Sequence, residues 1–454
     1  MEFQKKVLVI GTGKSGVNAG KVLLRKGAEI VLYDDRASLD VENLLSQFED
    51  REGISVVLGE INGAILSGIE LAVISPGVPV DSAVAQAVRN ENIPIWSEIE
   101  LAYRVSEGHL AAITGTNGKT TTTALVGDIF RHYTENSFTV GNIGIPYTEV
   151  ALSMNEDSYT VAEVSSFQLE TIDQFHPHVS AVLNLTPDHL DRHETMTNYA
   201  SIKLDICRNQ TAEDVLILNY DDPVTRKMAK DPRVCARVVF FSRQHSLKEG
   251  ICLDGEEIVL VEQGAKKRVI SCSELILPGG HNVENYMAGI GVAYYMGIPM
   301  DVIRDTLKTF KGVEHRIEFV REVNGVTYYN DSKGTNPDAA IKAVEAMSRK
   351  IVLIGGGYDK GVPFDDWIKS FEGRVKKLVL IGQTADIIAE TARKYGFTDY
   401  VFAKDLKEAV AVCAEAAVPG DTVLLSPACA SWGMFDNYEQ RGDLFKQYVN
   451  ELGA

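Results

Sequence analysis

The sequence predicts an α/β protein of three domains, each built around a sheet of parallel strands. Short apolar runs alternate with helical stretches along almost the whole chain, which is the pattern that parallel sheets produce. Two glycine-rich turns, at residues 11–16 and 115–118, each lie between an apolar run and a helix. The length of 454 residues suits two or three domains, and 45% hydrophobic residues are ample for their cores.

The first domain is predicted over residues 1–96. Residues 6–10 (KVLVI) form a short apolar strand, and a glycine turn follows it. Next come a helix that runs to about residue 26 and a strand at 29–33. The remaining predicted elements are a strand at 71–75 that ends in the turn SPGVP, a helix at 83–90 and a strand at 93–96. Proline and glycine in that turn stop the strand before them.

The second domain is predicted over residues 97–312 and the third over 313–454. The second has a helix at 98–105 and strands at 110–114, 160–164, 179–185 and 214–219. Residues 233–276 differ, because runs at 237–241, 258–261 and 268–271 alternate and carry turn signals. This pattern predicts an antiparallel flap or small sheet. Strands of the third domain are expected at 326–329, 350–354, 377–381 and 422–425.

Composition excludes several classes of protein. A formal net charge of −18 argues against a general nucleic-acid binder. No apolar run approaches the ~18 residues of a membrane span, and the start MEFQKKVLVIGTGKSG does not have the pattern of a signal peptide. The six cysteines lack CxxC or zinc-like spacing, so we expect reduced thiols in the cytoplasm.

The segment AITGTNGKTT, residues 112–121, predicts a triphosphate site. Backbone N–H groups of such a loop converge on phosphate oxygens, and the start of the following helix adds positive charge. Lys119 would reach the β- and γ-phosphates, and the hydroxyl of Thr120 could bind Mg²⁺. The general pattern has glycine where this chain has Ile113, so a tight turn with a solvated lysine is the alternative.

The segment GTGKSG, residues 11–16, has the dinucleotide-binding pattern GxGxxG between a strand and a helix. Asp34 and Asp35 follow at the end of the second strand. An NAD-binding domain is one interpretation. A diphosphate on a ribose has the same geometry, so a UDP-linked compound is the other.

Several polar residues follow predicted strands in the second domain. Glu163 ends a strand beside the phosphate-loop strand, where a Mg²⁺ ligand belongs in an α/β sheet. Asn142 lies in a turn and could simply cap it. His189 clusters with Asp188 and other charged residues, although a lone histidine is more often structural. Lys203 reads by itself as an ordinary helix lysine.

Two later segments are dense in polar residues. Asn282 and Asn285 are three apart on one helical face, which suits recognition of a planar base; helix capping is the alternative. The segment NDSKGTN, residues 330–336, places an acid, a lysine and hydroxyls in a loop after a strand, and His315 and Arg316 precede it.

These motifs, in this order, resemble the ATP-dependent Mur ligases of peptidoglycan precursor synthesis. The resemblance covers residues 11–442. It is carried by GTNGKTT, EVSSFQLE with Glu163, TPDHLDR, HN..N at 281–285, HR at 315–316 and NDSKGTN. Within the family, YDDR, SPGVP and SPACASWGMFDNYEQRG resemble the branch that adds D-glutamate. The DNPR motif of the diaminopimelate-adding branch is absent, and folylpolyglutamate synthases begin directly with the ATP loop.

The resemblance implies a Rossmann-like first domain, a P-loop ATPase-like central domain and a Rossmann-like third domain. It implies that ATP contacts Gly115, Thr116, Asn117, Gly118, Lys119, Thr120, Thr121, Asn282, Asn285, Arg316, Asp331 and Lys333. The UDP-substrate would contact Gly13, Lys14, Ser15, Asp34, Asp35, Arg36, Gly77, Asn142 and His189. D-glutamate would contact Thr335, Lys360, Ser431 and Tyr438, the last where relatives often carry phenylalanine.

The implied catalytic residues are Lys119, Glu163, His189 and Lys203. Two Mg²⁺ ions are expected, on Thr120, Glu163, His189 and a CO₂-derived carbamate of Lys203. The implied reaction joins D-glutamate to UDP-N-acetylmuramoyl-L-alanine through an acyl phosphate, with ADP and phosphate as products, in a cytoplasmic monomer. Closure of the domains, with hinges near residues 96 and 312, is expected to exclude water. Rival classes are another amide ligase, a nicotinamide-dependent oxidoreductase and a non-catalytic ATP-driven switch.

Overall fold

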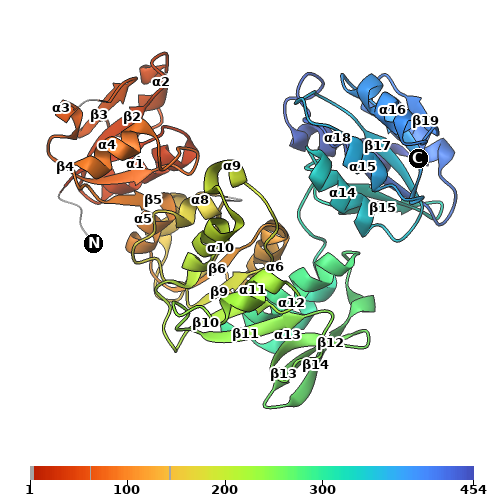
Figure 1. Ribbon diagram of the computed structural model, residues 1–454, viewed down its shortest axis with the longest axis horizontal. Helices are drawn as coiled ribbons and strands as arrows, with labels where there is room; N and C mark the ends of the chain where they lie inside the picture. The colour runs from red at the N-terminus through yellow and green to blue at the C-terminus, as the bar shows by residue number, and fades with distance from the viewer. Residues whose placement is uncertain (1–4, 62, 143–144, 454) are drawn as a thin grey trace. The chain divides into compact units, whose positions relative to one another are not determined.

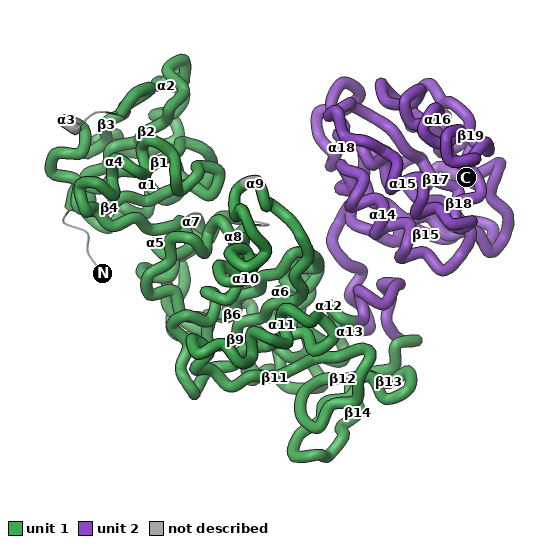
Figure 2. The backbone as a smooth tube through the Cα atoms, in the orientation of Figure 1, with its two compact units in different colours: residues 1–273, 284–307 green, residues 274–283, 308–454 purple. Residues whose placement is uncertain are grey.

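The computed structural model describes residues 5–61, 63–142 and 145–453. These residues form three separate β-sheets with helices between the strands (Figure 1). The chain divides into two compact units (Figure 2). The first unit holds residues 1–273 and 284–307, and the second holds 274–283 and 308–454. The first unit contains two of the sheets and the second unit contains the third.

The first sheet has five parallel strands in the order β3-β2-β1-β4-β5. Its strands are β1 (Lys6–Ile10), β2 (Glu29–Asp34), β3 (Ile54–Leu58), β4 (Ile69–Ile74) and β5 (Ile95–Ser97). Its helices are α1 (Lys14–Arg25), α2 (Val41–Leu45), α3 (Gly63–Leu66) and α4 (Ala83–Asn90). Strand order reverses beside β1, so the loops after β1, β2 and β4 meet at one edge, where α/β sheets bind ligands.

The second sheet has nine strands in the order β14-β13-β12-β11-β10-β9-β6-β8-β7. Its strands are β6 (His109–Thr114), β7 (Ser137–Gly141), β8 (Tyr159–Glu163), β9 (Val179–Val182), β10 (Val215–Asn219), β11 (Arg237–Ser242), β12 (Gly250–Asp254), β13 (Glu257–Glu262) and β14 (Ala265–Ser271). The strands from β7 to β12 are parallel, and β13 and β14 are antiparallel additions.

Helices precede, connect and follow the strands of this sheet along the chain. They are α5 (Glu98–Val105), α6 (Lys119–Tyr133), α7 (Tyr147–Val150), α8 (Ser166–Leu169), α9 (Leu190–His193), α10 (Met196–Leu204), α11 (Pro223–Met228), α12 (Gly280–Tyr295) and α13 (Met300–Thr309). Single 3₁₀ turns occur at Ala151–Ser153, Asp205–Cys207 and Cys272–Glu274. The helix α12 crosses from the second compact unit into the first.

The expectation of a separate antiparallel sheet over residues 233–276 is wrong in one respect. Strand β11 pairs in parallel with β10, in register from Val215 opposite Arg237. The reason is the connection, because α11 carries the chain back across the sheet before β11 begins. Only the β12–β13 and β13–β14 pairs are antiparallel, and they extend the main sheet rather than forming their own.

The third sheet has six strands in the order β15-β16-β20-β17-β18-β19, with only β15 antiparallel. Its strands are β15 (Glu318–Val323), β16 (Val326–Asn330), β17 (Ile351–Gly355), β18 (Val375–Leu380), β19 (Tyr400–Phe402) and β20 (Thr422–Leu425). Its helices are α14 (Pro337–Ala346), α15 (Asp365–Lys369), α16 (Ala385–Lys394), α17 (Leu406–Ala416) and α18 (Tyr438–Glu451).

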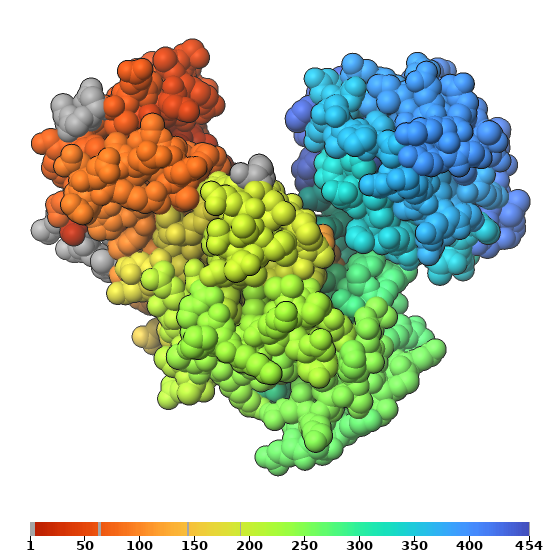
Figure 3. All heavy atoms as spheres, viewed as in Figure 1, coloured from red at the N-terminus to blue at the C-terminus, as the bar shows by residue number. Residues whose placement is uncertain are grey.

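The buried apolar side chains form separate clusters on the faces of each sheet. In the third sheet, Leu353, Leu378 and Trp367 belong to one cluster, while Val352, Val423 and Phe445 belong to another. The space-filling view shows the residues of this sheet, in blue, as a closely packed body (Figure 3). Within the described part of the chain, no helix has the length and apolarity needed to cross a membrane.

Candidate active site

The predicted phosphate loop joins the end of β6 to the start of α6. Gly115 and Gly118 have φ values of 143° and 83°, which favour glycine. A Cβ on Gly118 would lie 2.2 Å from Oδ1 of Asn285. The loop therefore needs glycine at residue 118 for its backbone angle and for close approach to Asn285, which is one of the predicted ATP contacts.

Asn184 holds this loop in place and was missed by the sequence analysis. Its Oδ1 accepts a hydrogen bond of 2.8 Å from the backbone N–H of Asn117, and its Nδ2 donates to the Asn117 carbonyl at 3.0 Å. Asn184 follows β9, the strand beside β6. A polar residue directly after a buried strand was the available signal.

Lys119 folds back over its own loop. Its ammonium donates to the carbonyl oxygens of Gly115 and Thr116, both at 2.8 Å. The Lys119 ammonium is therefore already held at the loop, where it could contact a bound phosphate, and does not extend into solvent. The next residue, Thr120, is buried in the first turn of α6, where a helix start favours anions.

Glu163 ends β8 and has one unsatisfied oxygen. Its Oε1 accepts a hydrogen bond of 2.9 Å from Nδ2 of Asn142. Its Oε2 is buried and has no hydrogen-bond partner among the described residues. Burying a carboxylate oxygen without a partner is costly, and oxygen is the ligand that Mg²⁺ prefers. The residues present therefore fit a divalent cation at this position.

Lys203 lies beside the phosphate loop, although it belongs to α10. Its ammonium is buried and donates to Oγ1 of Thr114 and to the Gly115 carbonyl, both at 3.0 Å. Burial holds the pKa of Lys203 well below its usual value, and the nearby charge of Lys119 lowers it further. Lys203 is therefore a buried lysine rather than a surface one, and its ammonium group loses a proton more readily than that of an exposed lysine.

His189 lies in the loop after β9 and begins α9 with a left-handed φ of 51°. Its side chain is about half exposed, its ring centroid is 4.9 Å from that of Phe167, and its Nε2 is 3.6 Å from Asp188. Phe167 follows β8, so His189 lies near the segment that follows Glu163.

A cavity at the edge of the first sheet has a volume of about 460 Å³. It is lined by Gly11, Thr12, Gly13, Lys14, Ser15, Asp34, Asp35, Arg36, Ser75, Pro76, Gly77, Val78, Gly141, Asn142 and Gln168. The cavity thus brings together the predicted UDP-substrate residues of both sheets of the first unit, except His189. Gln168 also lines it and was missed, although it lies in the SSFQLE motif.

Asp34 is fully engaged within this cavity wall. It accepts hydrogen bonds from the backbone N–H and the hydroxyl of Thr12, at 3.1 and 2.6 Å, and from Nε and Nη2 of Arg36, at 2.7 and 2.9 Å. The Arg36 guanidinium holds the pKa of Asp34 well below its usual value. Asp34 therefore orients Arg36 and Thr12, which leaves it poorly placed to hold the ribose hydroxyls of a nicotinamide dinucleotide.

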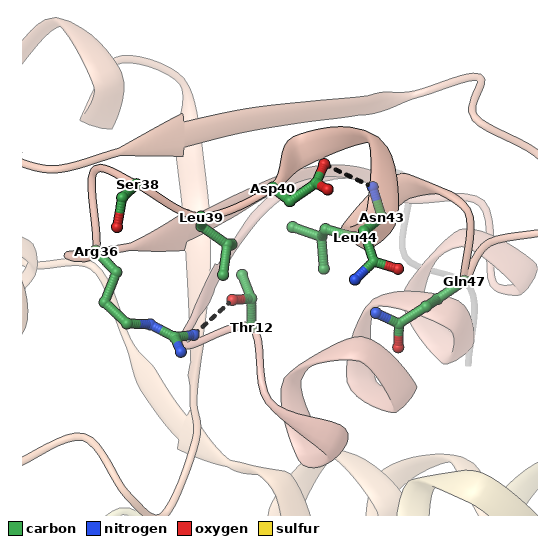
Figure 4. Close-up of a pocket in the computed structure, with 8 residues that line it drawn as sticks. All are labelled: Thr12, Arg36, Ser38, Leu39, Asp40, Asn43, Leu44 and Gln47. Carbon is green, nitrogen blue, oxygen red and sulfur yellow. Dashed lines mark hydrogen bonds between the residues drawn. The ribbon is translucent and has the colours of Figure 1, made fainter.

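A second cavity, of about 330 Å³, is also lined by Thr12 and Arg36 (Figure 4). Asn43 of α2 and Gln47, which follows α2, line it. Asp40 caps α2 by accepting a hydrogen bond of 3.1 Å from the backbone N–H of Asn43. Thr12 and Arg36 therefore belong to the walls of both cavities.

Of the predicted nucleotide contacts in the second unit, Asp331 and Lys333 follow β16, Arg316 precedes β15, and Asn282 lies in the first turn of α12. Asp331 is buried, accepts a hydrogen bond of 2.7 Å from the hydroxyl of Ser426, and has its pKa raised to about 7 by burial. The ammonium of Lys333 lies 5.8 Å from the ring centroid of Tyr438. Arg316 is close enough to Asp331 to favour its ionised form. Asn282 donates a hydrogen bond of 2.7 Å to the Pro278 carbonyl, so it also holds the turn before α12.

Predicted D-glutamate contacts fall on loops after three adjacent strands, β16, β20 and β17. Lys360 and Ser431 lie on two loops that pair through a hydrogen bond of 2.9 Å from the Tyr358 N–H to the Ala430 carbonyl. The Lys360 ammonium lies 5.4 Å from the ring centroid of Trp432, which is 55% exposed. Lys360 has no ion-pair partner in the described chain, so its charge is available to a carboxylate.

The other two predicted D-glutamate contacts, Thr335 and Tyr438, do not lie on the paired loops that carry Lys360 and Ser431. Thr335 is half-buried in the loop after β16, and Tyr438 begins α18, where burial raises the pKa of its phenol to about 12. The carbonyl of Tyr438 accepts a hydrogen bond of 2.8 Å from Ser332. Among the described residues, no hydrogen bond or ring contact joins Thr335 or Tyr438 to Lys360 or Ser431.

Comparison with protein families matches the three regions separately. Residues 5–97 match the N-terminal domain described as Mur ligase, MurD-like. Residues 113–293 match the Mur ligase middle domain, and residues 315–429 match the Mur ligase, glutamate ligase domain.

Curated relatives match over the full length. A UDP-N-acetylmuramoylalanine–D-glutamate ligase of Lachnospira eligens is 52% identical over 448 residues, which is 99% of each chain. The ligase of that name from Lachnoclostridium phytofermentans is 49% identical and covers 99% of this chain and 98% of its own. Among solved structures, UDP-N-acetylmuramate-alanine ligase MurC of Thermotoga maritima has a TM-score of 0.59 at 20% identity, covering 98% of this chain and 99% of its own. That likeness concerns the fold.

Proposed function

This chain belongs to the Mur ligase family, and we propose that it joins D-glutamate to UDP-N-acetylmuramoyl-L-alanine at the expense of ATP. The full-length relatives that carry this activity in their names support the choice of substrates. The single observation that carries the chemistry is the buried, unpartnered Oε2 of Glu163, at the end of the strand beside the phosphate-loop strand. A buried carboxylate oxygen without a hydrogen-bond partner favours a bound cation, and a nucleoside triphosphate would bind together with Mg²⁺.

In the proposed reaction, the alanine carboxylate of the UDP-substrate attacks the γ-phosphate of ATP. The products are an acyl phosphate and ADP. The neutral amine of D-glutamate then attacks the acyl carbon, phosphate leaves, and an amide remains. Lys119 and the backbone N–H groups of residues 115–121 would hold the phosphates and stabilise the charge that develops on them.

Two Mg²⁺ ions would be held by Thr120, Glu163, His189 and Lys203, and they would supply positive charge opposite the phosphate oxygens. Lys203 could take part only as an anion. Its neutral amine can add CO₂ and lose a proton to give a carbamate, which turns a cation into an oxygen ligand. The lowered pKa of Lys203 supports this step, because only the neutral amine reacts with CO₂.

The cavity of the first sheet would hold the UDP part of the substrate. Its diphosphate would lie at Gly13, Lys14 and Ser15, at the start of α1, and Arg36 would face the uracil end. Lys14 now pairs with Glu149 at 3.3 Å, so the diphosphate would compete for its charge. D-glutamate would lie at Lys360, Ser431, Thr335 and Tyr438. The proposal includes a monomer in the cytoplasm, which size-exclusion chromatography and cell fractionation would check.

The decisive experiment is phosphate release by the full chain with ATP, Mg²⁺ and UDP-N-acetylmuramoyl-L-alanine. D-Glutamate should stimulate release, while L-glutamate, L-lysine and diaminopimelate should not. Lys119→Met should abolish release, whereas Lys394→Met, an exposed lysine on α16, should leave it unchanged. Stimulation by another amino acid alone would replace the proposed substrate, and NAD(H) binding without phosphate release would favour the oxidoreductase.

A further inference from the structure

Arg441 is a fully buried arginine with an unusual set of partners. It lies in the first turn of α18 and is 0% exposed. Burial lowers its pKa to about 10, so it stays charged at neutral pH. Within the described chain no carboxylate lies within ion-pair distance of it. Its charge is therefore held by hydrogen bonds to neutral oxygens, a costly arrangement for a fold to keep.

Three hydrogen bonds from the guanidinium join two loops. Nε donates to the hydroxyl of Ser332 at 3.0 Å, and Nη2 donates to the Ser332 carbonyl at 2.8 Å. Nη1 donates to the Cys429 carbonyl at 3.1 Å. Ser332 lies between Asp331 and Lys333, the proposed ATP contacts. Cys429 lies two residues before Ser431, a proposed contact of D-glutamate.

A third loop packs against the same guanidinium. A Cβ on Gly357 would lie 3.4 Å from Nη1 of Arg441 and 2.4 Å from the carbonyl oxygen of Ala430. Gly357 follows β17 and leads to Lys360. Arg441 thus lies beneath the loops that follow β16, β20 and β17, which are adjacent strands of the third sheet.

We infer that Arg441 is a positioning residue that fixes the ATP loop (residues 331–335) relative to the amino-acid loop (residues 429–432). Its loss then weakens the binding of ATP and of D-glutamate together, although it touches neither. The inference rests on the proposed function for the identity of the two ligands. A residue needed only for folding would instead reduce the amount of active protein and leave the affinity of the remainder unchanged.

The test compares Arg441→Met, Arg441→Lys and Ser332→Ala with the unaltered chain. Arg393→Met, which changes an exposed arginine on α16 of the same unit, is the matched control. For each protein, kcat, the thermal midpoint, and the KM values for ATP, D-glutamate and the UDP-substrate are measured. ATP affinity is also measured by calorimetry, which needs no turnover.

Arg441→Met should raise the KM values for ATP and D-glutamate by about tenfold each, the effect of losing about one hydrogen bond to a charged group. The KM for the UDP-substrate should not change, because its proposed site lies in the first unit. Arg441→Lys keeps the charge but cannot reach three acceptors at once, so it should restore only part of both affinities. Ser332→Ala should shift the same two constants by less.

A fall in kcat and thermal midpoint with both KM values unchanged would overturn the inference, as would a rise in only one of them. If Arg441→Met fails to fold, Arg441→Lys and Ser332→Ala decide by the same criterion. Absence of D-glutamate-dependent phosphate release in the unaltered chain would count against the proposed function. An unchanged ATP affinity in the Arg441 variants would count against the inference itself.

Discussion

At the scale of single residues, the chain keeps several ionisable side chains buried beside its sheet edges. Glu163, Lys203, Asp331 and Arg441 are all less than 5% exposed. Each has hydrogen-bond partners that are mostly neutral, so each costs more to bury than a closed ion pair with good geometry. All four lie at or beneath loops that follow parallel strands, which is where α/β proteins bind ligands. Because burying these groups costs folding free energy, their burial is better explained by a role in function than by a role in stability.

Lys203 provides the first prediction. Because burial and Lys119 lower its pKa, more of this amine should be neutral, and so open to CO₂, than of an ordinary lysine at the same pH. Lys203→Ala should therefore lose nearly all phosphate release, and short carboxylic acids should restore part of it by filling the vacated space with a carboxylate. Intact-protein mass measured in bicarbonate should show one added CO₂ on the unaltered chain. Arg208→Ala, a nearby change outside the proposed site, is the control; equal activity in CO₂-depleted and bicarbonate buffers would contradict the carbamate.

Asp331 provides a prediction about pH. Its pKa is raised to about 7 in the folded protein, so between pH 4 and 7 the folded chain keeps a proton that the unfolded chain loses. Its contribution to the free energy of unfolding should thus fall as pH rises through this range, by at most about 4 kcal/mol. Asp331→Asn removes the titration and nearly keeps the shape.

Urea unfolding at pH 5 and 7.5 measures this contribution. The transition of the second unit should lose more stability with rising pH in the unaltered chain than in Asp331→Asn. Asp338→Asn, an exposed aspartate at the start of α14, should behave as the unaltered chain. Parallel pH dependence in all three proteins would show that Asp331 is already ionised well below pH 7.

At the scale of elements, most central strands were predictable and most edge strands were not. The strands predicted from apolar runs are confirmed, with ends that differ by at most three residues. Among the missed strands, β3, β7, β15 and β19 lie at sheet edges and are only partly buried, whereas β12 lies inside the second sheet between β11 and β13. A half-buried edge strand needs no continuous apolar run, so the sequence carries little signal for it. The alternation in β11 reflects its position near the antiparallel end of the sheet.

The helix α5 depends on a buried carboxylate at its start. Glu100 is 0% exposed, and its two oxygens accept hydrogen bonds from the backbone N–H groups of Asp173, Gln174 and Phe175, at 2.8–2.9 Å. Arg104, which pairs with Glu100 at 2.6 Å, also lies over the ring of Trp96. Glu100 thus ties α5 to the segment before β9.

Glu100→Ala should leave these N–H groups and Arg104 without their partner. We expect a loss of about 3–5 kcal/mol, the range for breaking a buried ion pair. Thermal unfolding should report the loss, and amide hydrogen exchange should show faster exchange at residues 173–175. Glu107→Ala changes an exposed glutamate after the same helix and should have no effect. Unchanged protection at 173–175 would show that other contacts hold that segment.

At the scale of the whole molecule, the motifs select the residues that we propose to carry chemistry but do not predict how they are held. Lys119 and Glu163 could be selected because each lies in a recognisable motif beside a strand, whereas Lys203, inside α10, was selected only through the family resemblance. The residues that support them, Asn184 and Arg441, act on loops far away in the sequence. Their roles depend on which strands are neighbours in the sheet, and no local sequence pattern predicts the order of the strands.

The proposed ATP contacts fall in both compact units, with Lys119 in the first and Lys333 in the second. We expect a bound nucleotide to hold the two units together, because it would contact both, and because an acyl phosphate needs protection from water. Small-angle X-ray scattering should therefore show a smaller radius of gyration when a non-hydrolysable ATP analogue, Mg²⁺ and the UDP-substrate are added together. Lys333→Met should reduce the change, while Lys311→Met should not. Identical scattering with and without ligands, at concentrations where calorimetry shows both bound, would mean that the nucleotide does not bridge the units.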